Sequence, residues 1–170
     1  MMQIAGAGAQ IVPLDVPPGQ VPEQVTRWVR ERRVAALHRA GFTGKGVKVL
    51  VIDTGCDVNH FYLRDRIAKV RNFTGVGAID DVTDRRGHGT HVAGIIHAGA
   101  PDAELYIAKG LGDDGKGYLE NLAAAVRWGI QEGVHIINAS WGSKQEPPEE
   151  TGLRRAIQEA TDAGILFVAS

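Results

Sequence analysis

The chain has 170 residues, 44% of them hydrophobic and 23% charged, so it is long enough for one domain with a sizeable core, and a disordered chain is not expected. A formal net charge of -1 gives no electrostatic reason to expect nucleic acid or an anionic membrane surface as a partner. No run approaches the ~20 apolar residues that span a bilayer. The first ten residues lack the basic start and apolar core of a signal peptide, which leaves the compartment open between the cytoplasm and export by a route not visible in the sequence.

The N-terminal region is expected to precede the folded domain. Residues 1–20 carry three prolines among small residues, which predicts an extended arm, and a helical stretch follows from about 22 to 40. We therefore divide the chain into residues 1–25, an arm or the remnant of a short pro-segment, and residues 26–170, the domain. The apolar, β-branched run 47–52 predicts a strand buried on both faces, and Asp53 stands at its C-terminal end.

Strands and helices alternate along the rest of the domain. A loop-rich region follows Asp53, and the later elements are a helix at 88–98, a strand at 105–108, a helix at 119–130, a strand at 134–139, a helix at 153–160 and a last strand at 165–169. Such alternation requires crossover connections. The sequence thus predicts a three-layer α/β fold, a mostly parallel sheet with helices on both faces, that is incomplete at its C-terminus.

Three segments combine the end of a strand or the start of a helix with polar residues and glycine. They are 49–57 (VLVIDTGCD), 87–94 (GHGTHVAG) and 136–142 (IINASWG). A carboxylate held by a buried strand can fix an imidazole in one tautomer, and that imidazole can then remove a proton from a hydroxyl nucleophile. Asp53 and His88 suit these two roles. The glycines beside His88 allow a close approach of backbone and substrate.

Together the three segments resemble the subtilisin-like serine peptidase family, in which D-T/S-G, H-G-T-H-V-A-G and I-N-x-S-x-G follow in this order. The resemblance runs from about Ala35 to the end of the chain. It implies that residues 26–170 are the N-terminal part of a peptidase domain with a polypeptide substrate. It also implies that Asp53 is the aspartate of the catalytic triad and His88 its general base, while His91 is a structural histidine that points into the protein.

The resemblance further implies two walls for an extended peptide, which would lie between them as a third strand. One wall is the segment Ser140, Trp141 and Gly142. The other is the edge strand 111–117, with Leu111, Gly115, Lys116 and Gly117. Without the family context, Gly115 and Gly117 would be interpreted as a plain turn after two aspartates.

The chain departs from the family pattern in three ways. The segment 97–102 is shorter than in secreted bacterial subtilisins, which insert a calcium-binding loop there, and Tyr62 stands where an acidic ligand is usual; we therefore expect no metal at this site and no cofactor. In place of the large prodomain of secreted members, we expect residues 1–25 to be a short remnant or an unrelated extension. The family's nucleophilic serine and oxyanion asparagine are also missing, so the chain is expected to be inactive alone and to need the missing C-terminal half as its partner. The alternative is a noncatalytic peptide-binding or regulatory fragment.

Other readings of these residues are weaker. A zinc site of His88 and His91 with Asp53 or Asp57 lacks the glutamate of the HExxH peptidases. A phosphotransferase would need a second aspartate where Gly55 stands, and no G-x-G-x-x-G follows the first strand, which excludes a dinucleotide fold.

Several further side chains receive secondary predictions. Four histidines are expected to be structural or solvated: His38, His60, His97 and His135. Cys56 is expected to pack as a small residue, although its position three residues after Asp53 leaves open that a bulky thiol reagent disturbs the site. Arg85 and Arg86 are expected in a solvated turn. Alternatively, they border the pocket that binds the substrate residue before the scissile bond.

Overall fold

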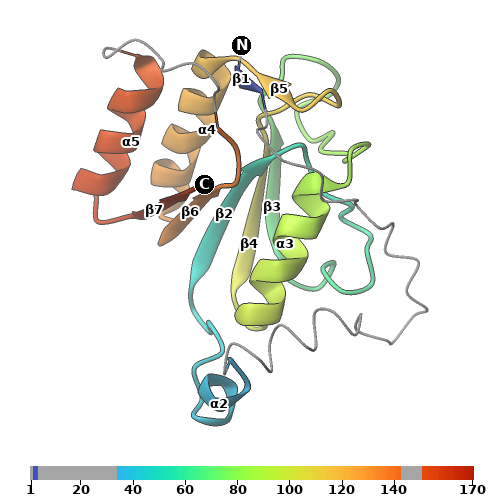
Figure 1. Cartoon of the computed structure of the whole chain (residues 1–170), viewed down its shortest axis with the longest axis vertical. Helices are drawn as coiled ribbons and strands as arrows, with labels where there is room; N and C mark the ends of the chain where they lie inside the picture. The colour runs from blue at the N-terminus through green and yellow to red at the C-terminus, as the bar shows by residue number, and fades with distance from the viewer. Residues whose placement is uncertain (1, 4–33, 143–150) are drawn as a thin grey trace.

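A five-stranded parallel sheet forms the centre of the computed structural model, which describes residues 2–3, 34–142 and 151–170 (Figure 1). The strand order is β3-β4-β2-β6-β7, and every neighbouring pair in this sheet is parallel. The mostly parallel sheet predicted from the sequence is confirmed. The strands are β2 (Lys48–Asp53), β3 (Ile67–Asn72), β4 (Glu104–Lys109), β6 (Ile136–Ala139) and β7 (Leu166–Ala169).

Helices cover both faces of this sheet, as predicted. Helix α3 (His88–Gly99) packs on one face, and α4 (Leu119–Glu132) and α5 (Gly152–Asp162) pack on the other (Figure 1). The short helix α2 (Val34–Arg39) precedes the sheet. Most of the helical stretch expected at 22–40 lies outside the described residues.

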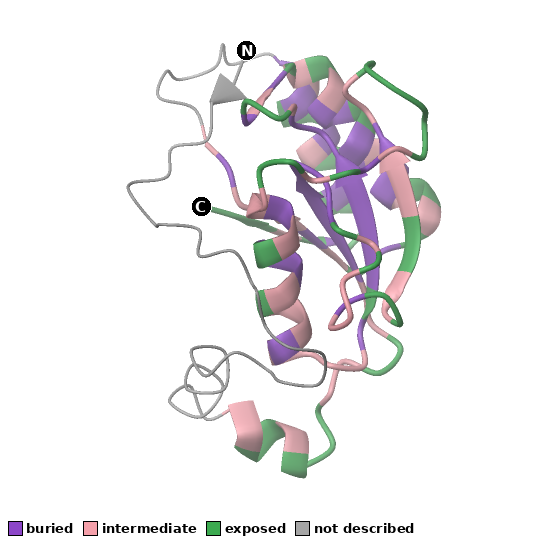
Figure 2. Ribbon diagram, turned by 90° about the vertical axis from the view of Figure 1, so that its right-hand side faces the viewer, coloured by how far each residue is buried: buried purple, intermediate pink, exposed green. Residues whose placement is uncertain are grey.

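The alternation of side chains along the central strands creates two separate cores. Leu50 and Ile52 point to the side of α4 and α5, and Val49 and Val51 point to the side of α3. All four are at most 4% exposed, which explains why residues 49–52 are apolar at every position and not at alternate ones. Figure 2 shows the buried strands between the helical layers.

Gly133 and Thr151 mark the end of α4 and the start of α5. Gly133 follows α4 with φ 63, a left-handed conformation that ends a helix without the strain a side chain would bring. The side chain of Thr151 caps α5 by accepting a hydrogen bond from the N–H of Arg154. The helices predicted at 119–130 and 153–160 end within two residues of α4 and α5.

The strand β3 was not predicted, since residues 54–87 were expected to be loop-rich. β3 lies at the edge of the sheet and pairs with β4 alone. It carries Lys69 and Arg71, and only Asn72 among its residues is buried. An edge strand open to solvent needs little apolar character, so it shows little of the hydrophobic signal on which the prediction depended.

A second, small sheet lies beside the first one. Strand β1 (Met2–Gln3) pairs antiparallel with β5 (Lys116–Gly117), with Met2 opposite Gly117 and Gln3 opposite Lys116. The edge of segment 111–117 thus accepts an extended backbone as a partner.

Aromatic side chains pack at the segment 97–102, where the sequence predicted no calcium-binding loop. The ring of Tyr62 meets His97 edge to face, with 4.5 Å between the ring centroids. Burial raises the pKa of Tyr62 and lowers that of His97, so both side chains favour their neutral forms. No three metal-binding side chains gather anywhere in the described ranges, and no helix there has the length and apolar character to cross a membrane.

We expect an excess of EDTA to leave the melting temperature unchanged, because neutral aromatic contacts and not carboxylate ligands hold residues 60–63 against the end of α3. Differential scanning calorimetry with and without the chelator measures this. A large drop in melting temperature, accompanied by loss of amide hydrogen-exchange protection at residues 97–102, would show that a cation binds there.

Candidate functional site

The C-terminal end of β2 meets the N-terminal end of α3. Asp53 is the last residue of β2 and His88 the first of α3. The Nδ1 of His88 lies 2.7 Å from Oδ1 of Asp53. The prediction that these two side chains lie within hydrogen-bond reach is therefore confirmed, whereas their catalytic roles stay a prediction.

The carboxylate of Asp53 is held almost without access to solvent. The residue is 1% exposed, and its Oδ1 also accepts a hydrogen bond of 2.7 Å from the N–H of Thr54. Its Oδ2 is buried without a hydrogen-bond partner among the described residues. A carboxylate in this setting accepts the Nδ1–H of His88, which leaves Nε2 of the ring as the free base.

The hydrogen bond to Asp53 changes the acidity of the imidazole. It raises the pKa of His88 above the ordinary value of 6.5, while burial opposes the shift, and the negative charges of Asp53 and Asp84 add to the rise. The charge of Arg86 acts in the opposite direction. The side chain of His88 is 24% exposed, so one part of the ring stays accessible from outside.

The close approach of α3 to β2 depends on Gly89. A Cβ at this position would lie 2.1 Å from the carbonyl oxygen of Gly55 and 3.1 Å from Cβ of Asp53. The residue before the helix, Gly87, has φ 80, where an ordinary side chain would be strained. The expectation that glycines beside His88 permit close backbone approach is confirmed for Gly89.

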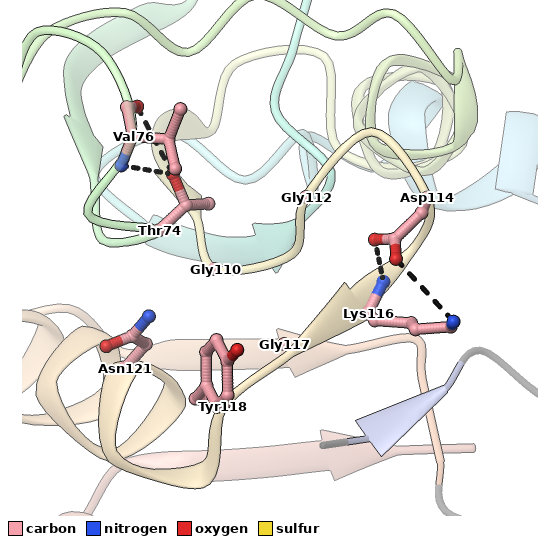
Figure 3. A pocket seen from close by; sticks show the side chains of 9 residues that line it. All are labelled: Thr74, Val76, Gly110, Gly112, Asp114, Lys116, Gly117, Tyr118 and Asn121. Carbon is pink, nitrogen blue, oxygen red and sulfur yellow. Dashed lines mark hydrogen bonds and ion pairs between the residues drawn. The ribbon is translucent and has the colours of Figure 1, made fainter.

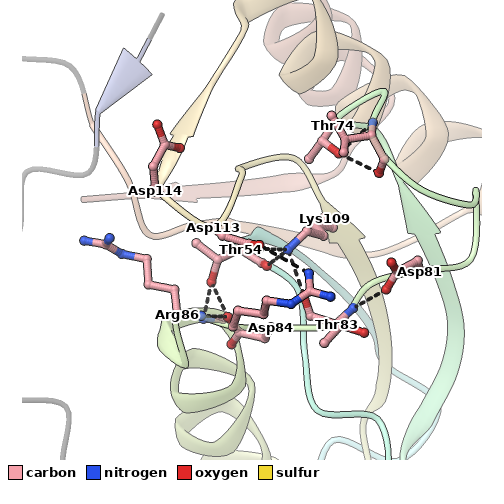
Figure 4. A network of polar contacts seen from close by, with 12 residues as sticks. Thr54, Thr74, Asp81, Thr83, Asp84, Arg86, Lys109, Asp113 and Asp114 are labelled. Carbon is pink, nitrogen blue, oxygen red and sulfur yellow. Dashed lines mark hydrogen bonds and ion pairs between the residues drawn. The ribbon is translucent and has the colours of Figure 1, made fainter.

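A buried lysine joins the elements around this pair (Figure 4). Lys109 ends β4 and is 6% exposed. Its Nζ donates to the carbonyl oxygens of Thr54 at 2.7 Å and Thr83 at 2.8 Å, and to Oδ1 of Asp113 at 2.9 Å. These three acceptors match the three N–H donors of an ammonium group. Lys109 was missed in the sequence, although a single lysine closing the apolar run LYIAK was an available signal.

The segment 111–117 is only partly a strand. Leu111 is 1% exposed and packs into the core beside α4, so its side chain does not face outward. Gly115 has φ 75 and donates its N–H to the carbonyl of Gly112, which is a turn, while Lys116 and Gly117 form β5. The edge-strand interpretation is thus confirmed for the last two residues alone, and the plain-turn interpretation holds for Gly115.

A crevice of about 150 Å³ opens beside β5 (Figure 3). Its walls come from the loop after β3, from segment 110–117 and from the start of α4. Val76 and Tyr118 on its walls are 76% and 54% exposed, so the crevice offers apolar surface next to the backbone of β5. The residues that line it are Thr74, Val76, Gly110, Gly112, Asp114, Lys116, Gly117, Tyr118 and Asn121.

The segment Ser140–Gly142 follows β6 directly and is not itself a strand. The indole N–H of Trp141 donates to the carbonyl oxygen of Ile52 at 2.7 Å, and its ring lies in the core. The hydroxyl of Ser140 accepts a hydrogen bond from the amide of Asn138. Any contact of Trp141 with a ligand therefore has to use its backbone. The part of these residues in substrate binding stays a prediction.

The prediction that His91 points into the protein is wrong, because its side chain is exposed. Helix α3 buries Val92 and Ala93 against the sheet, whereas His91 and Ile95, one turn apart, both lie on its outer face. His88 and His91 consequently do not converge, which removes the basis of a zinc site made from this pair.

Cys56 is a packed residue, 1% exposed. Burial, together with the charges of Asp84 and Asp57, raises the pKa of its thiol to about 12. Since the thiolate is the reactive form, Cys56 is not a target for thiol reagents in the folded protein, and the hypothesis that such reagents disturb the site is not supported. Arg85 pairs with Asp113 at 3.2 Å, in an exposed loop as expected.

We expect Gly89→Ala to lower the free energy of unfolding by about 1–3 kcal/mol, because the new methyl group forces α3 away from β2. Urea unfolding measures the change. Gly152→Ala is the matched control, since no heavy atom lies within 4 Å of the added carbon and its backbone does not adopt positive φ. Equal stability of the Gly89→Ala variant and the unchanged protein would contradict the packing described above.

Comparison with known proteins adds independent support. The model of the subtilase family, Peptidase S8, matches residues 44–170. The major intracellular serine protease of Bacillus subtilis (strain 168) is 38% identical over 142 residues, 76% of this chain and 44% of the relative. Subtilisin BL of Lederbergia lenta is 40% identical over 144 residues, 79% of this chain and 51% of the relative. A subtilisin of Bacillus sp. (strain TA39) is 36% identical over 145 residues, 75% of this chain and 34% of the relative.

The chain thus spans between about a third and a half of the length of these curated relatives, which are 34%, 44% and 51% covered. The family match includes all three motifs and every strand of the parallel sheet. The resemblance inferred from the motifs is confirmed, and the chain belongs to the subtilase family of peptidases.

Proposed function

We propose that the protein is a serine endopeptidase of the subtilisin type that hydrolyses polypeptides through an Asp-His-Ser triad. Asp53 and His88 are two members of this triad. The observation that supports the proposal most directly is the 2.7 Å hydrogen bond between Oδ1 of Asp53 and Nδ1 of His88. The names of the relatives, which are serine proteases and subtilisins, agree with it.

In this mechanism the buried carboxylate of Asp53 holds the imidazole and stabilises its protonated form. The Nε2 of His88 takes the proton from a serine hydroxyl as that oxygen attacks the scissile carbonyl, and later gives the proton to the leaving amine. The pKa of His88, raised by the Asp53 hydrogen bond, suits a base that also has to act as an acid.

The nucleophile and the oxyanion donor are proposed to come from outside these 170 residues. Ser140 and Ser170 make no hydrogen bond with His88 in the structure as described, and the hydroxyl of Ser140 is engaged by Asn138. Leu166 and Val168 of the edge strand β7 are 59% and 43% exposed. Exposed apolar side chains on a sheet face are a surface that the C-terminal half of the same fold would cover.

Substrate binding is proposed to use strand addition between the segment 111–117 and the segment Ser140–Gly142. The pairing of β1 with β5 supports this proposal, since it demonstrates backbone pairing of an extended segment along the edge Lys116–Gly117. The same observation favours the second candidate function, a noncatalytic peptide-binding protein. The domain boundary near residue 26 belongs to this proposal as well; the family match begins at residue 44.

A fluorophosphonate probe distinguishes the two functions. We expect no labelling of the isolated 170 residues, and labelling of the active protein that contains them. His88→Ala should abolish the labelling, because the serine then lacks its base, while His38→Ala, a histidine bonded to Gly99 far from the pair, should preserve it. Labelling of the isolated chain at Ser140 or Ser170 would contradict the assignment, and the absence of labelling in every form would favour the noncatalytic function.

The pH dependence of hydrolysis follows from the raised pKa of His88. Since the neutral imidazole is the working base, kcat/KM should rise with pH through a pKa above 6.5, the ordinary value. Asp53→Asn should move this limb to lower pH and reduce kcat on the order of 10⁴-fold. Asp57→Asn, at an exposed carboxylate in the same segment, is the control. An unchanged limb in Asp53→Asn would contradict the proposal.

The same shift predicts how stability depends on pH. A raised pKa in the folded state means that the folded protein binds the proton more tightly than the unfolded chain. The contribution of the Asp53–His88 pair to the free energy of unfolding is thus complete below about pH 6.5 and is lost as the pH rises through the folded pKa of His88. Urea unfolding across this range should show the loss in the unchanged protein and not in His88→Ala.

A further inference from the structure

Asp84 is the centre of a set of hydrogen bonds that none of the roles above uses (Figure 4). Its Oδ1 accepts from the hydroxyl of Thr54 at 2.8 Å and from the N–H groups of Gly87 at 2.8 Å and Arg86 at 3.2 Å. Its Oδ2 accepts from the N–H of Thr90 at 2.8 Å and from the hydroxyl of the same residue at 2.7 Å. One carboxylate therefore satisfies five donors.

These donors belong to the two elements that carry Asp53 and His88. Thr54 directly follows Asp53, and Thr90 lies in the first turn of α3, two residues after His88. The hydroxyl of Thr54 also accepts the N–H of Gly89 at 3.1 Å. Asp84 and Thr54 thus join the end of β2 to the start of α3 through hydrogen bonds separate from the one between Asp53 and His88.

The first turn of α3 has no other cap. Its N-cap residue is Gly87, which has no side chain to accept the free N–H groups at the start of a helix. The N–H of Gly89 is satisfied by Thr54 and that of Thr90 by Asp84. The loop before α3 and the strand end therefore supply the cap together, which determines the position of the helix relative to β2.

We propose that Asp84, acting with Thr54, is a positioning residue that holds the first turn of α3 so that the imidazole of His88 stays on the carboxylate of Asp53. The proposal rests on the proposed function, because it concerns the geometry of the same pair. Asp84 does not contact His88 or Asp53 through any hydrogen bond of the described residues; it acts through Thr54, Gly87 and Thr90.

The ionised form of Asp84 is the one that fits this role. Burial opposes ionisation, but the hydrogen bonds from Thr90, Thr54 and Gly87 lower the pKa of Asp84 below its usual value. All five groups around the carboxylate donate, so a side-chain amide in the same place would turn its N–H groups toward other donors and break part of the cap. An isosteric change from carboxylate to amide consequently disturbs the geometry without removing volume.

The test is Asp84→Asn in the active protein that contains this chain. We expect kcat for peptide hydrolysis to fall about ten- to hundredfold with little change in KM, since the base is displaced and the peptide-binding edges are not. Loss of the Asp84 charge by itself lowers the pKa of His88, so the NMR titration of the ring is made in Thr54→Val, which keeps this charge and should still shift the pKa toward its ordinary value. Asp81→Asn is the matched control, because this carboxylate lies in the same loop and bonds Thr83, which is part of neither β2 nor α3.

A second pair of variants tests the link through the strand end. Thr54→Val removes the hydroxyl that joins Asp84 to Gly89 and should lower kcat, whereas Thr54→Ser retains the hydroxyl and should preserve most of it. This pair also decides the proposal if Asp84→Asn does not fold.

Two results separate failure of this inference from failure of the proposed function. If Asp84→Asn and Thr54→Val lower the melting temperature but leave kcat unchanged, and Thr54→Val leaves the His88 titration unchanged, Asp84 is only a stabilising cap and the inference is overturned. If Asp53→Asn also leaves the His88 titration and kcat unchanged, the triad assignment itself is wrong.

Discussion

The hydrogen bond between Asp53 and His88 is the constraint on which the rest of the site depends. The two residues are 35 positions apart, and they meet only because a buried strand ends where a helix begins. The contact requires α3 to approach β2 so closely that the helix backbone touches the carbonyl of Gly55, which excludes any side chain at position 89. The parallel sheet supplies the rigid end that makes such an approach reproducible.

The charged groups of Lys109 and Asp84 near this contact are stabilised by hydrogen bonds to neighbouring residues. Lys109 uses all three of its donors on two carbonyl oxygens and a carboxylate, and Asp84 accepts from five donors. An isolated charge in such a place would be strongly unfavourable, so each partner keeps the others in position. The strand end, the loop before α3 and the segment 111–117 are thereby joined into one polar network around the pair.

One strand of each sheet lies at a surface that the proposed function uses: β5 in the small sheet and β7 in the large one. The edge at β5 is already paired with β1, while β7 presents exposed Leu166 and Val168. The first edge supports peptide binding by strand addition, and the second supports a larger domain around these residues. Both features agree with the proposal that the described elements hold the Asp53–His88 pair while the nucleophile comes from elsewhere.

The sequence by itself determined the parallel α/β architecture, the family and the pair Asp53 and His88, because apolar runs and glycine-containing motifs are local signals. The tertiary structure decided what depends on neighbours distant in the chain. The strand β3 was missed because an edge strand shows little hydrophobic pattern, and His91 was placed wrongly because the orientation of α3 on the sheet determines which histidine faces inward. The roles of Asp84 and Lys109 arise only when the loop before α3, β2 and β4 meet, since a lone charged residue in a sequence does not reveal its hydrogen-bond partners.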